Sequence, residues 1–303
     1  MNKQIFPLLL VFVLGTAACK DKQDVQRKPG SVRIVGSDTE MKLVSKMALE
    51  FQRLQGDRYD FSVLGGGSSV GIASLIDGEA EIANSSRSIH SDELEQLEAK
   101  GISVKSVAFA IDAVAIVCHP MNSVDSISTL QLQAILSGGL RNWKELGGAD
   151  RPIRFYGRDQ ASGTHQFLED RFLRNNGFSE QMIELPSNDE IVRMVTEDTF
   201  AIGYVGVAFL LDERGKPNEE IWAMNLYTEG DRMSYSPYEG NAVIRGAYPL
   251  VRPLYQYFTD EENEALREFI KFELSDAGQE MVGAFGFYPL SAEFLEENRR
   301  KGF

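Results

Sequence analysis

Four short loops in this 303-residue chain carry the residue types that hold an anion. Three of them place Ser37, Ser69 and Ser162 close to the start of a predicted helix, and the fourth is the stretch "NSSR" at residues 84–87. The first turn of a helix has unpaired N–H groups and a partial positive charge, so it attracts anions without a formal cation. Because serine is also a common helix cap, a purely structural role is the alternative for each single loop.

An arginine stands beside one of these loops. Arg158 precedes Ser162 by four residues in "GRDQASGT", so its guanidinium can reach an anion at that helix start. The alternative is a surface arginine paired with Asp159 or Glu169. Several such loops in one chain, one of them with an arginine, favour a common oxyanion site.

A buried carboxylate is predicted at Asp112, within the otherwise apolar stretch 107–117. A carboxylate removed from water needs a partner. That partner is either structural, such as Arg87 or the backbone, or it is a protonated oxygen of the ligand.

The elements that position these loops alternate along the chain. Strands are predicted at 31–36, 59–64 and 153–157, and each ends in glycine, serine or threonine before a helical pattern begins. This alternation indicates an α/β fold with a parallel or mixed sheet, in which ligands bind at the carboxyl ends of strands. A terminal helix is predicted within 261–287. The helix after the first strand is predicted to pack through Val44, Met47, Ala48, Phe51 and Leu54.

The N-terminus is typical of a secreted protein. Residues 1–18 have the basic start and the apolar run, at 5–14, of a signal peptide. The stretch "GTAAC" resembles the lipobox of bacterial lipoproteins, whose cysteine, here Cys19, is acylated after cleavage; Thr16 stands where that pattern prefers leucine. The alternative is ordinary cleavage near Ala18. Polar residues then predict a flexible tether over 19–30.

Composition narrows the classes of partner. The formal net charge is −14, which does not favour nucleic acid or an anionic membrane surface. The glycine-rich stretch "GGGSSVG" lacks the lysine of a P-loop, and the G-x-S-x-G motif of serine hydrolases is absent. The three histidines, His90, His119 and His165, do not have the spacing of metal ligands. We therefore expect no cofactor and no metal.

Eight motifs occur in the order found in one known family. They are "GSDT", "LGGGSSVGI", "AEIANSSR", "SGGLRNWKELGG", "GRDQASGT", "AIGYVGVAF", "YPLVRPLY" and "GFYPL". Together they cover about residues 31–290. Because of these motifs and their order, the chain resembles the phosphate-binding proteins of bacterial phosphate ABC importers, which are type 2 periplasmic-binding proteins.

The resemblance implies an α/β fold of two lobes with mixed sheets, joined by two crossing strands near 112–118 and 248–257. The ligand cleft would lie between the lobes. Lobe I would be discontinuous, residues 31–113 plus 249–303, and lobe II would be residues 114–248. A monomer is also implied.

The resemblance also implies which residues contact phosphate. Some relatives have an aspartate where this chain has Ser86, and that aspartate accepts a bond from a proton-bearing ligand oxygen. Here the role would fall to Asp112 or be lost, while Arg87 would either contact the anion or pair with Asp112. Carried over position by position, the implied phosphate contacts are Ser37, Thr39, Ser68, Ser86, Arg158, Ser162, Gly163 and Thr164.

The implied function is reversible binding of inorganic phosphate for delivery to the membrane permease of an ABC importer, by a protein anchored outside the cytoplasm through lipid on Cys19. One alternative is another tetrahedral oxyanion, such as sulfate or molybdate, or an organic phosphonate. Another is a secreted phosphatase with Ser162 or Ser68 as nucleophile, although a serine needs an activating base and the sequence offers only His165 nearby. A role in adhesion or phosphate sensing is a third.

Overall fold

The computed structural model describes residues 30–303 except 57, 175–176, 213, 232 and 260–262. The predicted signal peptide, residues 1–18, lies outside the described residues, as do Cys19 and all of the predicted tether except Gly30. No helix in the described part of the chain is long and apolar enough to cross a membrane.

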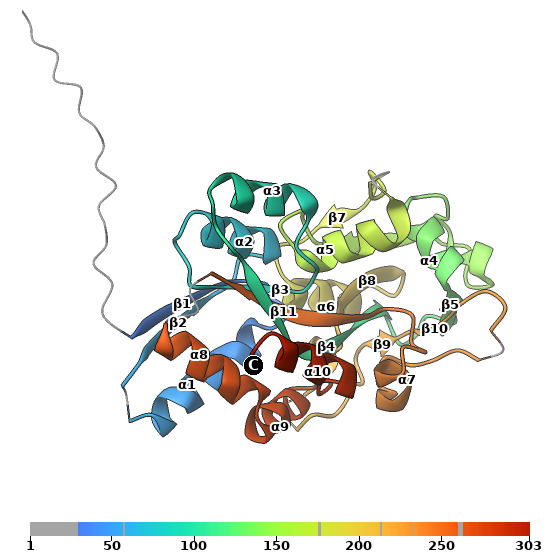
Figure 1. Ribbon diagram of the computed structural model, residues 1–303. Coiled ribbons are helices and arrows are strands. Elements are labelled where there is room, and N and C mark those ends of the chain that lie inside the picture. Colours follow the sequence, from blue (N-terminus) through green and yellow to red (C-terminus); the bar gives the residue numbers. More distant parts are fainter. Residues whose placement is uncertain (1–29, 57, 175–176, 213, 232, 260–262) are drawn as a thin grey trace, which may run out of the picture.

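Strands and helices alternate through most of the chain (Figure 1). The strands are β1 (Ser31–Gly36), β2 (Asp60–Leu64), β3 (Ile82–Ser85), β4 (Lys105–Cys118), β5 (Ser126–Ser128), β6 (Arg154–Gly157), β7 (Ile183–Glu184), β8 (Ala201–Gly206), β9 (Trp222–Ala223), β10 (Asn225–Tyr227) and β11 (Val251–Phe258). The α-helices are α1 (Met41–Leu54), α2 (Ser68–Ile76), α3 (Ser91–Ala99), α4 (Thr129–Leu136), α5 (Gly163–Leu168), α6 (Asn188–Glu197), α7 (Gly240–Ile244), α8 (Glu264–Leu274), α9 (Asp276–Ala284) and α10 (Ala292–Arg300). Short helical segments η1 (Trp143–Leu146), η2 (Glu169–Leu173) and η3 (Val207–Leu210) complete the described elements.

The long strand β4 joins two groups of strands into one mixed sheet of order β2-β1-β3-β11-β4-β8-β6-β7. It pairs antiparallel with β11 as far as Ala113 and antiparallel with β8 from Val114 onward. We call the elements around β2, β1, β3 and β11 the first lobe, and those around β8, β6 and β7 the second lobe. Within each lobe the outer strands pair in parallel. The mixed α/β fold predicted from the sequence is therefore confirmed.

Helices cover both faces of the first-lobe strands, with α2 and α3 on one side and α1 and α8 on the other (Figure 1). Side chains alternate between the faces of a strand. Accordingly Ile82 packs with the cluster that includes Phe51 and Phe269, whereas its neighbour Ala83 packs with Ile72 and Leu97. Because both faces are covered, polar side chains at the inner ends of these strands and in the loops that follow them, such as Asn84, Ser37 and Ser86, lie in the interior.

Two helical predictions needed correction. The single terminal helix predicted within 261–287 is two helices, because Ser275 is in an extended conformation between them and its hydroxyl accepts a hydrogen bond of 3.3 Å from the Gly278 N–H, which caps α9. In α1, four of the five predicted core residues are buried, but Leu54, the last residue of the helix, is exposed.

Candidate anion-binding site

Three first-lobe loops meet because they follow the adjacent strands β1, β2 and β3. The Ser37 N–H donates to the Asn84 carbonyl at 3.0 Å, and the Gly67 N–H donates to the Gly36 carbonyl at 3.0 Å. The Ser86 N–H donates to Oγ of Ser68 at 3.1 Å. The hydroxyls predicted to hold an anion in the first lobe therefore gather at one end of these strands.

The loop before α5 brings the second lobe against the first. Ser162 caps α5, its Oγ accepting a hydrogen bond of 3.4 Å from the His165 N–H. The hydroxyl oxygens of Thr164 and Thr39 are 3.4 Å apart. A Cβ on Gly163 would lie 2.1 Å from Oγ of Ser68, so only glycine lets the two loops come this close.

Of the three serines for which a capping role was the alternative, Ser162 alone is the N-cap of its helix among the described elements. The N-cap of α1 is Glu40 and that of α2 is Gly67. The Ser37 hydroxyl instead accepts a hydrogen bond of 3.3 Å from the Thr39 N–H within the loop. Ordinary capping therefore does not account for the shared position of these loops.

Asp112 and Arg252 form a fully buried ion pair at the centre of this region. Arg252 donates to Oδ2 of Asp112 from Nε at 3.0 Å and from Nη2 at 2.8 Å. It also donates to the Ser86 carbonyl at 3.1 Å and to Oγ1 of Thr164 at 2.9 Å, so it ties both lobes to the centre. Oδ1 of Asp112 is buried without a partner among the described residues. The partner of Asp112 is therefore Arg252, and the Arg87 alternative is wrong.

Arg158 approaches the same region from the second lobe. Its Nη2 donates to Oδ2 of Asp38 at 2.8 Å, across the lobes. Its backbone is fixed because its N–H donates to the Tyr204 hydroxyl at 2.8 Å. Its Nε is buried and has no partner within the described part of the chain. Arg158 therefore keeps a donor for an anion, and it is paired with neither Asp159 nor Glu169 in the contacts of the described residues.

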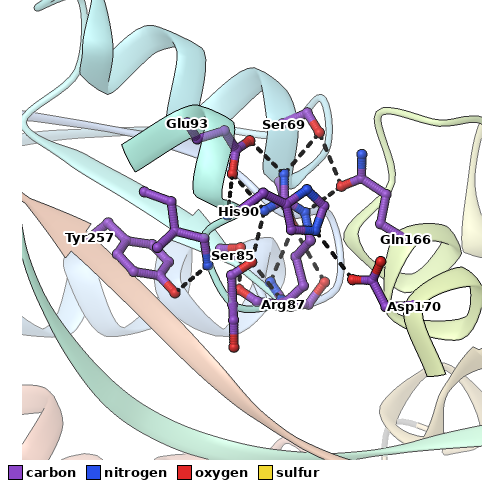
Figure 2. A network of polar contacts seen from close by, with 12 residues as sticks. Ser69, Ser85, Arg87, His90, Glu93, Gln166, Asp170 and Tyr257 are labelled. Carbon is purple, nitrogen blue, oxygen red and sulfur yellow. Dashed lines mark hydrogen bonds and ion pairs between the residues drawn. The ribbon is translucent and has the colours of Figure 1, made fainter. Parts of the chain in front are cut away.

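Arg87 is oriented differently, and Figure 2 shows its surroundings. Nη1 donates to the Ser88 carbonyl and to Glu93, each at 2.8 Å; Nη2 donates to Glu93 at 2.7 Å and to the Ser69 hydroxyl at 3.1 Å. Nε donates to Oε1 of Gln166. These contacts account for all five N–H groups of a guanidinium. The expected contact between Arg87 and an anion is therefore not supported by its geometry.

The predicted site is buried as well as convergent. The serine, threonine, arginine and aspartate side chains predicted to form it are each at most 5% exposed. Next to Thr39, the fully buried Glu40 has no partner for either carboxyl oxygen among the described residues. Burial raises the pKa of Glu40 to about 8, and the Asp112 carboxylate adds to the rise, while Ser37 and Arg252 oppose it. Glu40 is therefore mostly neutral at pH 7.

The contacts do not favour nucleophilic catalysis. The ring of His165 contacts the Arg158 carbonyl through Nδ1 at 2.6 Å and lies 4.2 Å from the ring of Phe178. Burial lowers its pKa. Among the described residues, this ring makes no hydrogen bond to the hydroxyl of Ser162 or Ser68, and no group of three metal-ligating side chains occurs there. The side chains that converge here instead offer hydroxyl and guanidinium donors, the groups that bind an anion by hydrogen bonds.

Sequence reasoning missed Arg252. It stands in "YPLVRPLY", and the order of this motif in the chain does not indicate a role for the arginine. A charged residue beside apolar ones in a predicted strand resembles the signal that identified Asp112, and the register of β11 and β4 places the two residues opposite each other.

Comparison with known proteins agrees with this architecture. The chain is similar to the phosphate-binding protein PstS of Pseudomonas aeruginosa, at 29% identity over 92% of this chain and 89% of the relative. It is 28% identical to the phosphate-binding protein PstS of Borreliella burgdorferi, over 92% of this chain and 97% of the relative. A crystal structure of a candidate phosphate ABC transporter substrate-binding protein from Clostridium perfringens, with bound phosphate, matches 86% of this chain and 100% of that chain, with 26% identity and a TM-score of 0.74.

The family model described as the PBP superfamily domain matches residues 23–277. This range covers most of the chain and includes both lobes. The chain therefore belongs to the PBP superfamily, and the resemblance to phosphate-binding proteins of this class that its motifs predicted is confirmed.

Proposed function

We propose that this protein binds inorganic phosphate outside the cytoplasm and delivers it to the membrane permease of an ABC importer, without chemistry. The observation that carries this proposal is the pairing of Asp112. Its Oδ2 is held by Arg252, which also donates to Ser86 and to Thr164, while its buried Oδ1 has no partner in the described part of the chain. The relatives are named as phosphate-binding proteins, and one solved structure contains bound phosphate, which supports the same ligand.

The donors come from both lobes, so the ligand would stabilise the closed arrangement of the lobes. The proposed contacts are Ser37, Thr39, Ser68 and Ser86 of the first lobe, Arg158, Ser162, Gly163 and Thr164 of the second, and Asp112 between them. Each hydrogen bond to a charged ligand contributes about 1.5 to 3 kcal/mol, and the entropy lost on binding offsets several of them. A dissociation constant at or below about 1 µM, about −8 kcal/mol, follows from that balance.

Oδ1 of Asp112 gives the proposal its specificity. Phosphate near neutral pH carries at least one proton, which it can donate to this oxygen. Sulfate carries none, so it would leave a buried carboxylate oxygen facing a sulfate oxygen. Sites built around such a bond reject an analogue that lacks it by about 10⁴-fold or more. The site should therefore discriminate against sulfate and molybdate.

The test is a calorimetric titration of the purified protein, stripped of bound anion, with phosphate and then with sulfate at neutral pH. Tight one-to-one binding of phosphate without heat from sulfate is expected. Comparable affinity for both anions would assign the site to oxyanions in general, and binding of neither would refute the proposal.

We further propose the finer arrangement implied by the resemblance. Lobe I would be residues 31–113 plus 249–303 and lobe II residues 114–248; the change of partner of β4 after Ala113 supports this boundary. We also propose that the protein is a monomer, as the resemblance implies. A dimer in light scattering would contradict this.

The N-terminal segment would be a signal peptide, cleaved before Cys19, whose lipid anchors the protein to a membrane on its extracytoplasmic side. The lipobox-like stretch "GTAAC" supports this proposal. Metabolic labelling of the producing cells with a palmitate analogue tests it. Label in the wild-type protein and none in Cys19→Ser is expected, and an unlabelled wild-type protein would exclude the lipid anchor.

A further inference from the structure

Besides an exposed ion pair between Lys42 and Asp189, two groups of contacts join the lobes. One group belongs to the anion site, such as the contact between Thr39 and Thr164. The other lies beside it, where the loop after β3 and the start of α3 face α5 and η2 (Figure 2). Here Gln166 and Asp170 of the second lobe meet Arg87, Ser69 and His90 of the first.

Gln166 is the centre of this second group. Its Oε1 accepts a hydrogen bond from Oγ of Ser69 at 3.1 Å and another from Nε of Arg87. The contact is half-buried and one of its donors is charged, and charged donors give the stronger hydrogen bonds of proteins. The neighbouring pair of His90 and Asp170, 3.2 Å apart, is more exposed, at 32% and 55%, and such pairs contribute little.

The first lobe holds its donor in place by itself. Glu93 binds Arg87 through both carboxyl oxygens, and the same carboxylate accepts a hydrogen bond of 2.8 Å from the His90 N–H at the start of α3. The Arg87 side chain is only 2% exposed. Because these partners all lie in the first lobe, Nε would keep its position when the lobes separate and would lose only its acceptor on Gln166.

We propose that Gln166 is a positioning residue that latches the two lobes together, and that this latch slows the release of the bound anion. The proposal rests on the proposed phosphate binding. The latch acts without contact between Gln166 and the anion: it adds to the stability of the closed state alone, so its loss increases the fraction of open protein and the rate of release.

Two variants test the latch. Gln166→Leu has a similar size but no acceptor, and it should release phosphate at least about tenfold faster, because it loses the hydrogen bond from the charged Arg87 as well as that from Ser69. Gln166→Glu keeps an acceptor oxygen for Arg87 and Ser69 and makes it charged, so it should release phosphate no more than about threefold faster than the wild type. The matched control is Gln96→Leu, which changes an exposed glutamine of α3.

Stopped-flow release of phosphate gives the rates, and thermal unfolding of each variant shows whether the fold is intact. Faster release in Gln166→Leu, with wild-type behaviour in Gln96→Leu, would support the latch. Equal release from wild type and Gln166→Leu would overturn it, and so would equally fast release from Gln166→Leu and Gln166→Glu. If Gln166→Leu does not fold, a Gln166→Glu protein that releases phosphate tenfold faster overturns the latch, and one that is no more than about threefold faster supports it.

The distance between the lobes, measured without any anion, distinguishes a failure of this proposal from a failure of the proposed function. Spin labels at Glu98→Cys and Glu180→Cys, both at exposed positions on opposite lobes, report the distance between the lobes without any anion. Burial raises the pKa of the Cys118 thiol to about 12, so this cysteine should not be labelled, and a Cys19→Ser background removes the other cysteine of the chain. A wider distance distribution in Gln166→Leu than in wild type supports the latch even if phosphate does not bind, and identical distributions overturn it.

Discussion

Arg252 and Asp112 stand opposite each other on the antiparallel strands β11 and β4, and two N–H groups of the arginine bind one and the same carboxylate oxygen. The two oxygens of the Asp112 carboxylate therefore have different roles. Oδ2 neutralises the buried arginine, and Oδ1 remains an acceptor. An ion pair between neighbouring strands thereby fixes the direction in which the second oxygen points.

Replacement of Asp112 by asparagine should weaken the preference for phosphate. The amide would keep a carbonyl oxygen for Arg252 and present an N–H₂ group where Oδ1 now lies. That group can donate to any oxyanion, so the ratio of phosphate to sulfate affinity should fall by about a hundredfold or more. Calorimetry with both anions measures the ratio, and an unchanged value would remove Asp112 from the role of selective acceptor.

Loss of Arg252 should destabilise the whole protein. Arg252→Met would leave the Asp112 carboxylate buried and unpaired, at a cost of about 3 to 5 kcal/mol in the free energy of unfolding. The matched control is Arg193→Met, because Arg193 pairs with Glu197 at the surface, where both side chains are more than half exposed; it should cost less than about 1 kcal/mol. Urea unfolding compares the two, and equal effects would contradict the importance of the buried pair.

Gly163→Ala should impair binding more than stability. The new Cβ would lie 2.1 Å from Oγ of Ser68 and 2.6 Å from Oγ of Ser86, both in the opposite lobe, so the lobes could not approach fully. Phosphate affinity should fall at least about tenfold, while the cores of the lobes remain intact. Gly283→Ala is the control, since a Cβ there meets no atom within 4 Å. Wild-type affinity in Gly163→Ala would show that the loops do not close this tightly.

Glu40 should make stability depend on pH. Its pKa is about 8 in the folded protein and about 4.5 when unfolded, so the folded state binds the extra proton between these values. The free energy of unfolding should therefore fall as the pH rises from 4.5 to 8, by up to about 1.4 kcal/mol per pH unit from this group. Glu40→Gln should show a flatter profile in urea unfolding across this range. Profiles of equal slope would mean that Glu40 is ionised in the folded state.

Sequence reasoning found the loops because their signal is local. A strand that runs into glycine, serine or threonine before a helix marks a βα loop, and the three strands predicted on this basis are present within one residue of the expected bounds. The same reasoning failed where the partner is distant in the chain. Nothing near Asp112 indicates Arg252, 140 residues away, because strand pairing alone brings them together.

The ion-pair partner of Arg87, Glu93, is only six residues away in the sequence. Glu93 stands at the third position of α3, where a glutamate commonly binds back to the residue before the helix, and it does so here with the His90 N–H. Glu93 also binds Arg87, and this contact depends on the path of the loop after β3, which the sequence alone does not reveal. The break at Ser275 had a visible signal, a serine followed by an acidic residue, but the apolar spacing on both sides favoured one continuous helix.

Because β4 pairs with strands of both lobes, the number of residues between its two halves decides which side chains face each core. Beyond Ala113, its even-numbered residues, such as Ile116 and Cys118, pack into one core cluster, and its odd-numbered residues, Ala115 and Val117, pack into another. One residue added between Asp112 and Val114 would exchange these two sets, while Asp112 kept its place opposite Arg252. Two added residues would restore the alternation but shift the second lobe along the strand. Point substitutions can therefore tune this site, whereas insertions or deletions at the centre of β4 would break the link between anion and lobe.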